Sequence, residues 1–145
     1  MGGRAGGPAF GEDEYYLAFV GTPSKTAPWM LQFGGHHLAV NVSEGHPYAR
    51  LHGHSFKVEV YLRGEPEKGK DWVYDFGEIE RHIAEIRAQL DHNYLNEIDG
   101  LQVPTLENIS RWIWYQLDNV LPGLNRVCVR RGTCGEGCVF SARGL

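Results

Sequence analysis

The sequence predicts an α+β domain in which two helices cover one face of an antiparallel β-sheet. Residues 55–63 alternate between apolar and polar side chains, which is the period of a half-buried strand. Two later segments, 76–90 and 106–117, place their apolar residues three and four positions apart, which is the period of an amphipathic helix. Strand patterns stand before and after this pair of helices, so the helices are expected to be segregated to one side of the sheet.

Length and composition restrict the class of protein. A chain of 145 residues with 42% hydrophobic residues is long enough for one domain with its own core. The net charge of -4 argues against a general nucleic-acid binder, and no apolar run reaches the roughly 18 residues that a membrane helix needs. The three cysteines are odd in number and lie close together near the end, which fits free thiols. We therefore expect a soluble, cytoplasmic protein that binds neither nucleic acid nor a membrane.

The N-terminal part is the least regular. Residues 1–13 are rich in glycine and predict a disordered leader, and Tyr15 to Val20 predict a short strand. Residues 29–42 are β-prone but contain Gly34 and Gly35, which indicates a bend or bulge before a pair of histidines. We divide the chain into an atypical or disordered extension, residues 1–28, and a domain, residues 29–145.

The remaining elements follow in order. After the strand at 55–63, a polar loop leads to a second strand at 72–75. The first helix begins at Phe76 and lines up five apolar residues on one face (Phe76, Ile79, Ile83, Ile86 and Leu90). Thr105 is placed to cap the second helix, and Glu107 lies in its first turn, where the helix dipole favours an acidic residue. A strand with Val127 and Val129 facing inward and a closing strand at 138–142 complete the domain.

The histidines are concentrated in one segment. Five of the seven histidines lie within the nineteen residues 36–54. His52 and His54 stand two positions apart at the start of a strand, so both rings project from the same face and can reach one metal ion. A third histidine from the preceding strand would leave the fourth tetrahedral position for water or substrate, as in catalytic zinc sites. Solvated imidazoles at a polar strand entry remain the alternative.

The run HLAVNVSEGHPYARLHGHSF at residues 37–56 resembles the metal-site segment of the 6-pyruvoyltetrahydropterin synthase family, and most closely its 6-carboxytetrahydropterin synthase branch, which acts in queuosine precursor synthesis. Further family motifs follow in order: VYDF at 73–76, LDH at 90–92, PTLEN at 104–108 and TCGEGC at 133–138. The resemblance covers residues 33–142. Residues 15–42 also weakly resemble a functionally uncharacterised secreted family, which suggests a recombined N-terminus.

The resemblance implies a site and an assembly. Its zinc ligands would be His37, His52 and His54, with His36 a neighbour that points the other way. Asp91 and His92 match the family's Asp-His pair, which assists proton transfer. The family also implies the tunnelling fold, in which sheets of several subunits join into a barrel, here as a homo-hexamer made of two trimers.

Two positions depart from the family pattern. Tyr48 stands where the family has a catalytic cysteine, and a phenol with a reference pKa of about 10 is a weaker base at neutral pH than a thiol of about 8.5. Arg131 stands where the family has a glutamate that anchors the pterin, and a guanidinium has only donors. Glu136 is nearby and able to supply the missing acceptor. Glu107 and Arg50 are further substrate-binding candidates, with Arg50, like Arg63 and Arg130, offered for the triphosphate.

Three hypotheses about function follow. The first is a zinc-dependent lyase that converts 7,8-dihydroneopterin triphosphate to 6-carboxytetrahydropterin, with Asp91, His92 and Tyr48 as catalytic residues. The second is a zinc enzyme of the same fold that uses Tyr48 for aldol or epimerase chemistry on a pterin or a small polyol. The third is a homologue that binds metal but has lost turnover.

Overall fold

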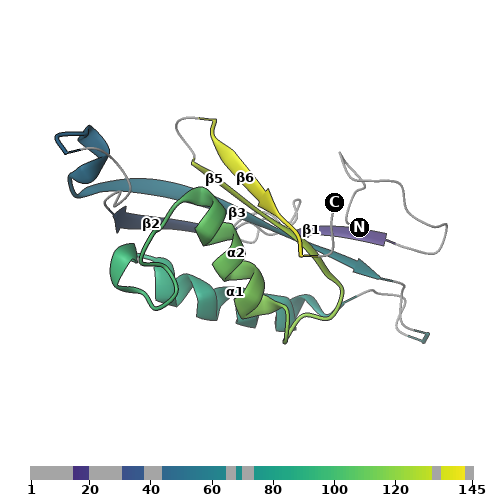
Figure 1. The fold of residues 1–145 in the computed structure, drawn as a ribbon. Coiled ribbons are helices and arrows are strands. Elements are labelled where there is room, and N and C mark those ends of the chain that lie inside the picture. Colours follow the sequence, from purple (N-terminus) through teal and green to yellow (C-terminus); the bar gives the residue numbers. More distant parts are fainter. Residues whose placement is uncertain are drawn as a thin grey trace.

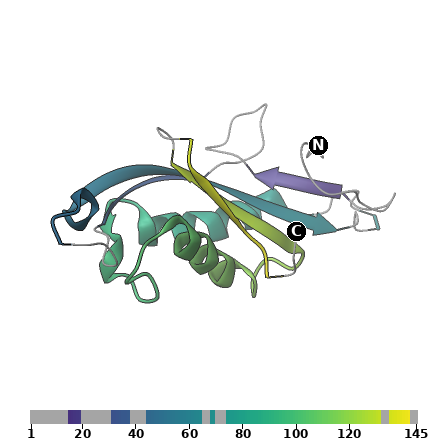
Figure 2. The same ribbon diagram turned by 45° about the horizontal axis from the view of Figure 1, so that its top comes forward.

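The computed structural model describes residues 15–19, 31–37, 44–64, 68–69, 74–131 and 135–142, and for 15–19, 31–37 and Tyr48 it describes the backbone only. The described part contains a six-stranded sheet with the order β4-β2-β3-β5-β6, and β1 pairs with β3 beside this path. Both long helices lie on one side of the sheet (Figures 1 and 2). This arrangement confirms the predicted α+β architecture with two helices on one face.

The central strand β3 (His52–Gly64) organises the sheet. On one edge it pairs with β2 (Leu31–His37) near its start and with β1 (Tyr15–Phe19) near its end, and on the other edge it pairs with β5 (Leu124–Arg131). The strand starts three residues before the predicted Ser55, because His52 and Gly53 pair with β2 although they lack an apolar alternation. The histidine pair is therefore part of the sheet.

Alternation along β3 divides its two faces. Phe56, Val58, Val60 and Leu62 are at most 1% exposed and form the core with the helices, whereas the residues between them are partly or fully exposed. Val127 and Val129 of β5 lie opposite Val60 and Val58 and are fully buried, as predicted. Because His52 and His54 continue the even-numbered series, they lie on the helix-covered face, beyond the apolar core.

Helix α1 (Phe76–Leu90) begins at the predicted residue, and Asp75 caps it by accepting a hydrogen bond of 2.8 Å from the Gly77 N–H. The predicted strand at 72–75 is wrong for Tyr74 and Asp75, because a capping Asp75 starts a helix there, and residues 72–73 lie outside the described part. Ile79, Ile86 and Leu90 are buried, but Phe76 is 47% exposed at the helix start. The predicted apolar face thus begins one turn later.

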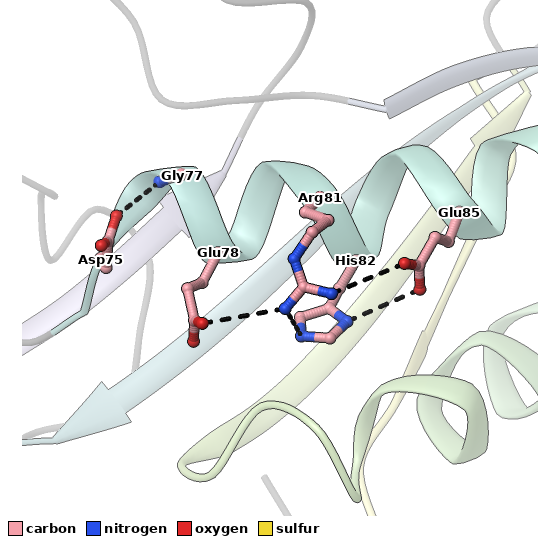
Figure 3. Close-up of polar contacts among 6 residues, drawn as sticks. All are labelled: Asp75, Gly77, Glu78, Arg81, His82 and Glu85. Atoms are coloured by element: carbon pink, nitrogen blue, oxygen red, sulfur yellow. Dashed lines mark hydrogen bonds and ion pairs between the residues drawn. The ribbon is translucent and has the colours of Figure 1, made fainter.

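The charged and polar side chains of α1 form a network. Arg81 lies between Glu78 and Glu85, at 3.8 and 3.7 Å, and His82 lies 3.8 Å from Glu85 (Figure 3). These contacts are i,i+3 and i,i+4 pairs within one helix, which contribute a few tenths of a kcal/mol each. His82 therefore belongs to the polar network of the helix.

The segment after α1 contains a short strand that the sequence periodicity did not predict. Strand β4 (Asn93–Tyr94) pairs in parallel with β2, with Asn93 opposite Gly35 and Tyr94 opposite His36. The predicted sheet was wholly antiparallel, so this short parallel pair corrects it. Two residues are too few to show a period of two.

Helix α2 (Leu106–Leu117) is capped by Thr105, whose hydroxyl accepts from the Asn108 N–H at 3.2 Å, as predicted. Its buried face includes Ile109, Ile113 and Trp114. Strand β6 (Gly137–Phe140) is the last strand of the sheet. It begins one residue before the predicted strand at 138–142 and ends two residues before it. Two further single-turn elements are η1 (Pro47–Ala49) and η2 (Leu95–Glu97).

Several sequence predictions concern residues that the structure describes only in part. Cys128 and Cys138 are free thiols, as predicted, and Cys134 lies outside the described residues. The leader at 1–13 and the proposed extension also lie largely outside them. Within the described residues, no helix combines the length and apolar character that crossing a bilayer requires.

Candidate active site

His52 and His54 form the centre of the candidate site. Their rings lie edge to face, with centroids 4.8 Å apart and an interplanar angle of 88°. The antiparallel register places His37 directly opposite His52, and His36 opposite Gly53. Residues directly opposite each other in an antiparallel pair lie on the same face of the sheet. The register therefore favours the position of His37 over that of His36 as the third member.

The orientation of His52 is fixed by its own backbone. Its Nδ1 atom lies 2.7 Å from the carbonyl oxygen of Arg50. A carbonyl only accepts hydrogen bonds, so Nδ1 carries a proton, and the neutral form of the ring keeps its lone pair on Nε2. This is the tautomer that a metal ligand needs, held by the kind of backbone contact that orients ligating histidines.

Burial lowers the pKa of His54 below its ordinary value of 6.5, and the positive charges of Arg131 and His52 lower it further, while Glu136 acts in the opposite direction. The ring is therefore neutral at physiological pH, which is the protonation state in which histidine binds metal. The hydrogen bond at Nδ1 of His52 and the lowered pKa of His54 are thus both compatible with zinc binding.

The complete three-histidine set is not tested by the described residues. Among the described side chains, no three His, Cys, Asp or Glu residues are grouped closely enough to hold a metal ion. The side chain of His37 is outside this set, so its role as a ligand stays a prediction. Tyr48 lies in η1, four residues before His52, and its side chain is also outside the described part.

Asp91 and His92 follow the last turn of α1. Nδ1 of His92 lies 3.1 Å from Oδ1 of Asp91, and Arg87 lies 3.5 Å from the other carboxylate oxygen. The backbone of His92 has a φ of 56°, a left-handed conformation that non-glycine residues adopt rarely and often at functional sites. The side chain of His92 is 86% exposed. The two side chains thus lie in contact and the imidazole is open to solvent, and their role in proton transfer stays a prediction.

Sheet pairing relates this pair to the histidines. Asn93, the residue after His92, lies opposite Gly35, and Gly35 lies opposite His54. Both ribbon views place η1, the start of β3 and the segment after α1 at the same end of the molecule (Figures 1 and 2). The Asp91–His92 pair therefore comes from an element two strands away from His54.

The substrate-binding candidates divide into two groups. Glu136 forms an ion pair with Arg131 at 3.0 Å, and Arg131 lies opposite Phe56 in the sheet, whose ring is 6.0 Å from that of His54. Arg50 is exposed beside the His52 ring that it anchors, and Glu107 is exposed in the first turn of α2, a different element. The roles of Arg50 and Glu107 stay predictions.

Sequence reasoning treated Arg131 only as a departure from a motif. Its contact with Glu136 depends on the β5–β6 pairing, in which the Arg131 N–H also donates to the Glu136 carbonyl at 3.0 Å. The two residues are five positions apart, across a turn. A hairpin between the two residues is the sequence signal that predicts this contact.

Comparison with known protein families adds independent evidence. The family model described as 6-pyruvoyl tetrahydropterin synthase matches residues 32–143, which span the sheet and both helices. The chain belongs to this family. A second family model, described only as a protein of unknown function, matches residues 7–47. This match overlaps residues 15–42, which were predicted to resemble a functionally uncharacterised family.

The curated relatives of this chain include two differently named enzymes. The chain is 38% identical to 6-carboxy-5,6,7,8-tetrahydropterin synthase from Synechocystis sp. over 100 residues, which cover 65% of this chain and 78% of that protein. It is 39% identical to dihydroneopterin monophosphate aldolase from Pyrococcus furiosus over 102 residues, covering 70% and 82%. The family members thus carry two different names.

Among solved structures, 6-pyruvoyl tetrahydropterin synthase from Caenorhabditis elegans matches with a TM-score of 0.73 at 18% identity, covering 92% of this chain and 99% of that one. A Plasmodium vivax 6-pyruvoyltetrahydropterin synthase variant, in which a glutamate described as a catalytic residue is replaced by cysteine, matches with a TM-score of 0.64 at 18% identity, covering 89% and 98%. At this identity the likeness establishes the fold. The chain has the tunnelling fold that the family resemblance implied.

Proposed function

We propose that this protein is a zinc-dependent lyase of the 6-carboxytetrahydropterin synthase type, which acts on 7,8-dihydroneopterin triphosphate in queuosine precursor synthesis. The observation that carries the proposal is the His52–His54 pair, 4.8 Å apart on one face of the sheet, with His37 in register opposite His52. Family membership and the name of the Synechocystis relative support the substrate class.

Zinc fits the donor set that this chain offers. His37, His52 and His54 would hold it, since imidazole nitrogen is a common zinc ligand and a three-histidine set leaves a position open. When bound, zinc would polarise the hydroxyl groups of the substrate side chain and lower their pKa. Arg50 contributes through its carbonyl, which holds the His52 ring in the required tautomer.

Asp91 and His92 would handle the proton. The carboxylate of Asp91 lies 3.1 Å from Nδ1 of His92 and would accept a proton carried there, so the Nε2 atom of His92 would be left to take a proton from the substrate or to return it. Arg87 holds the other oxygen of Asp91 and keeps the carboxylate in place. Tyr48 would act as a further acid or base, a weaker one than a cysteine.

A second function is favoured by one specific feature of the chain. Tyr48 replaces the thiol, and a retro-aldol cleavage needs a base for one hydroxyl proton but no thiolate. In that reaction the bond between the first and second side-chain carbons of a dihydroneopterin phosphate breaks, which yields 6-hydroxymethyl-dihydropterin and a glycolaldehyde phosphate. The Pyrococcus furiosus relative is named dihydroneopterin monophosphate aldolase.

We also propose that the chain forms a homo-hexamer, a dimer of trimers, in the cytoplasm. An open sheet leaves strand edges that need partners, and β6 lies at one edge of the described sheet. The 86% exposure of the His92 side chain is compatible with a site that a neighbouring subunit completes. Sedimentation analysis would give about six times the chain mass of 16.3 kDa if this is right, and a stable monomer would contradict it.

The experiment that tests the function identifies the products. Zinc-loaded protein is incubated separately with 7,8-dihydroneopterin triphosphate and with the monophosphate, and each mixture is analysed for acetaldehyde with a carboxypterin and for a glycolaldehyde phosphate with a hydroxymethylpterin. The first pair of products supports the synthase and the second pair supports the aldolase. His52→Ala should abolish either, and His36→Ala is the matched control that should not. Zinc-loaded protein that forms neither pair would contradict both activities and favour an inactive homologue.

A further inference from the structure

Helix α1 ends in a turn that directs the chain into strand β4. The Asp91 N–H still donates to the Arg87 carbonyl at 2.7 Å, as in a helix. His92, the next residue, has a φ of 56° and leaves the helical path. It is the one non-glycine residue with a positive φ in the part of the chain that the structure describes. The turn therefore depends on a backbone conformation that something around it must hold.

The side chain of Asn93 bonds to the end of the helix. The last four carbonyls of an α-helix have no N–H partner within the helix itself. Nδ2 of Asn93 donates to two carbonyls in the last turn of α1, that of Gln89 at 3.0 Å and that of Ala88 at 3.4 Å. The residue that follows His92 is thus tied back to the turn that precedes it.

The backbone of Asn93 belongs to the sheet. Asn93 pairs with Gly35 of β2, and Gly35 pairs with His54 of β3. Residues level with each other in a sheet lie on the same face, so the Asn93 side chain lies on the helix-covered face, as its bonds to α1 require. Two residues further on, Leu95 is fully buried in the core. Asn93 therefore joins the end of α1 to the sheet that carries the histidine pair.

The ring of His92 has little else to place it. Its side chain is 86% exposed, and Nδ1 lies 3.1 Å from the Asp91 carboxylate. An exposed ring gains little orientation from packing, so its position follows from the backbone on either side. Asp91 holds the side toward the helix, through its own N–H. Asn93 holds the side toward the sheet.

We propose that Asn93 is a positioning residue for His92, whose side-chain amide holds the left-handed turn that sets the imidazole beside Asp91. The proposal rests on the proposed function, in which His92 moves a proton. The two amide bonds of Asn93 lie at the exposed surface, where water replaces part of what is lost when they are removed. Removing them should therefore affect turnover more than stability, whereas a cap that served only the helix would affect stability alone.

The first test compares Asn93→Ala with Gln89→Ala. Asn93→Ala should lower kcat by about 10- to 100-fold, since a displacement of about 1 Å near the reacting atoms has an effect of that size. KM should change little, and circular dichroism should show a folded protein. Gln89→Ala is the matched control, because it removes another exposed amide bond of the same helix end, from Nε2 to the Glu85 carbonyl at 3.4 Å. Wild-type kcat in Asn93→Ala would overturn the proposal.

A double-mutant cycle separates positioning from general damage. Asparagine tolerates the left-handed conformation, so His92→Asn removes the imidazole and keeps the turn. In that background Asn93→Ala should cause no further loss of kcat, because the group that it positions is already gone. A further loss as large as in the wild type would overturn the proposal and show that Asn93 acts on the fold as a whole.

Hydrogen exchange gives a readout that does not depend on activity. Mass spectrometry of the peptide that covers residues 91–95 should show faster amide exchange in Asn93→Ala than in the wild type or Gln89→Ala. Unchanged exchange would overturn the clamp. Wild-type protein that forms neither pair of products would overturn the proposed function, and exchange alone would then decide whether Asn93 holds the His92 turn, so the two failures are distinguishable.

Discussion

The Nδ1 atom of His52 lies 2.7 Å from the carbonyl oxygen of Arg50, the residue two positions before it. This short contact means that the strand entry itself sets the tautomer and the direction of the ring. His54, two residues later, is kept neutral by burial and by the nearby charge of Arg131. The backbone and the sheet thus prepare two imidazoles for a metal.

Replacing the proton relay should slow turnover without weakening substrate binding. His92→Asn and Asp91→Asn should each lower kcat by about 10²- to 10⁴-fold, because a positioned acid or base contributes that much. KM should change little, since neither residue is placed in ring recognition. Steady-state kinetics on the active product pair measures both constants. His82→Asn is the control on α1, and full activity of His92→Asn would show that the pair is structural.

Tyr48→Cys tests the departure that bears most on activity. A thiol has a reference pKa about 1.5 units below that of a phenol and so supplies more base at neutral pH. We expect acetaldehyde formation from 7,8-dihydroneopterin triphosphate to rise by about tenfold or more. Tyr48→Phe serves as the control that removes the hydroxyl without adding a thiol. An unchanged rate in Tyr48→Cys would show that this position does not carry the base.

The thiol of Cys128 should be unreactive in the folded protein. Burial raises its pKa, and Glu59 raises it further, against the lowering effect of Arg130 and Arg126. A raised pKa leaves less thiolate at pH 8, so reaction with a disulfide reagent should be roughly tenfold or more slower than at Cys138. The rates are compared in two double serine variants, each retaining one of these thiols. Equal rates before unfolding would contradict the buried placement.

Thr105→Ala should weaken α2 by removing its cap. The hydroxyl accepts the Asn108 N–H, and losing an N-cap of this kind costs about 0.5–2 kcal/mol of unfolding free energy. Chemical denaturation of the variant measures the loss, which should appear as a lower midpoint at an unchanged slope. Thr105→Ser keeps the acceptor and should stay close to the wild type. An equal loss in both variants would point to packing as the cause.

Much of the fold was predictable because its signals are local. The alternation from Phe56 to Leu62 predicted the central strand, and Thr105 predicted the start of α2, since both depend on residues adjacent in sequence. The predicted strand at 72–75 failed because Asp75 caps a helix, and a capping side chain resembles an exposed strand residue in the alternation. Strand β4 was missed because its two residues pair with a segment some sixty positions away.

Only part of the candidate site was predictable from the sequence. The spacing of His52 and His54 put two imidazoles on one face, and the motif resemblance paired Asp91 with His92. The contact between Arg131 and Glu136 depends on the register of a hairpin, which spacing does not specify. A second pairing, between β3 and β5, places Arg131 on the same face as the histidines, because it puts Arg131 opposite Phe56. Sequence reasoning therefore saw a lost anchor where the structure shows an ion pair.

Zinc content tests the central claim most directly. Elemental analysis of the purified chain should find about one zinc per chain in the wild type and in His36→Ala, and almost none in His37→Ala, His52→Ala or His54→Ala, because a zinc site with three protein ligands loses most of its affinity with any one of them. Circular dichroism confirms that each variant is folded. Zinc retained by the three variants, or lost equally from His36→Ala, would contradict the three-histidine site.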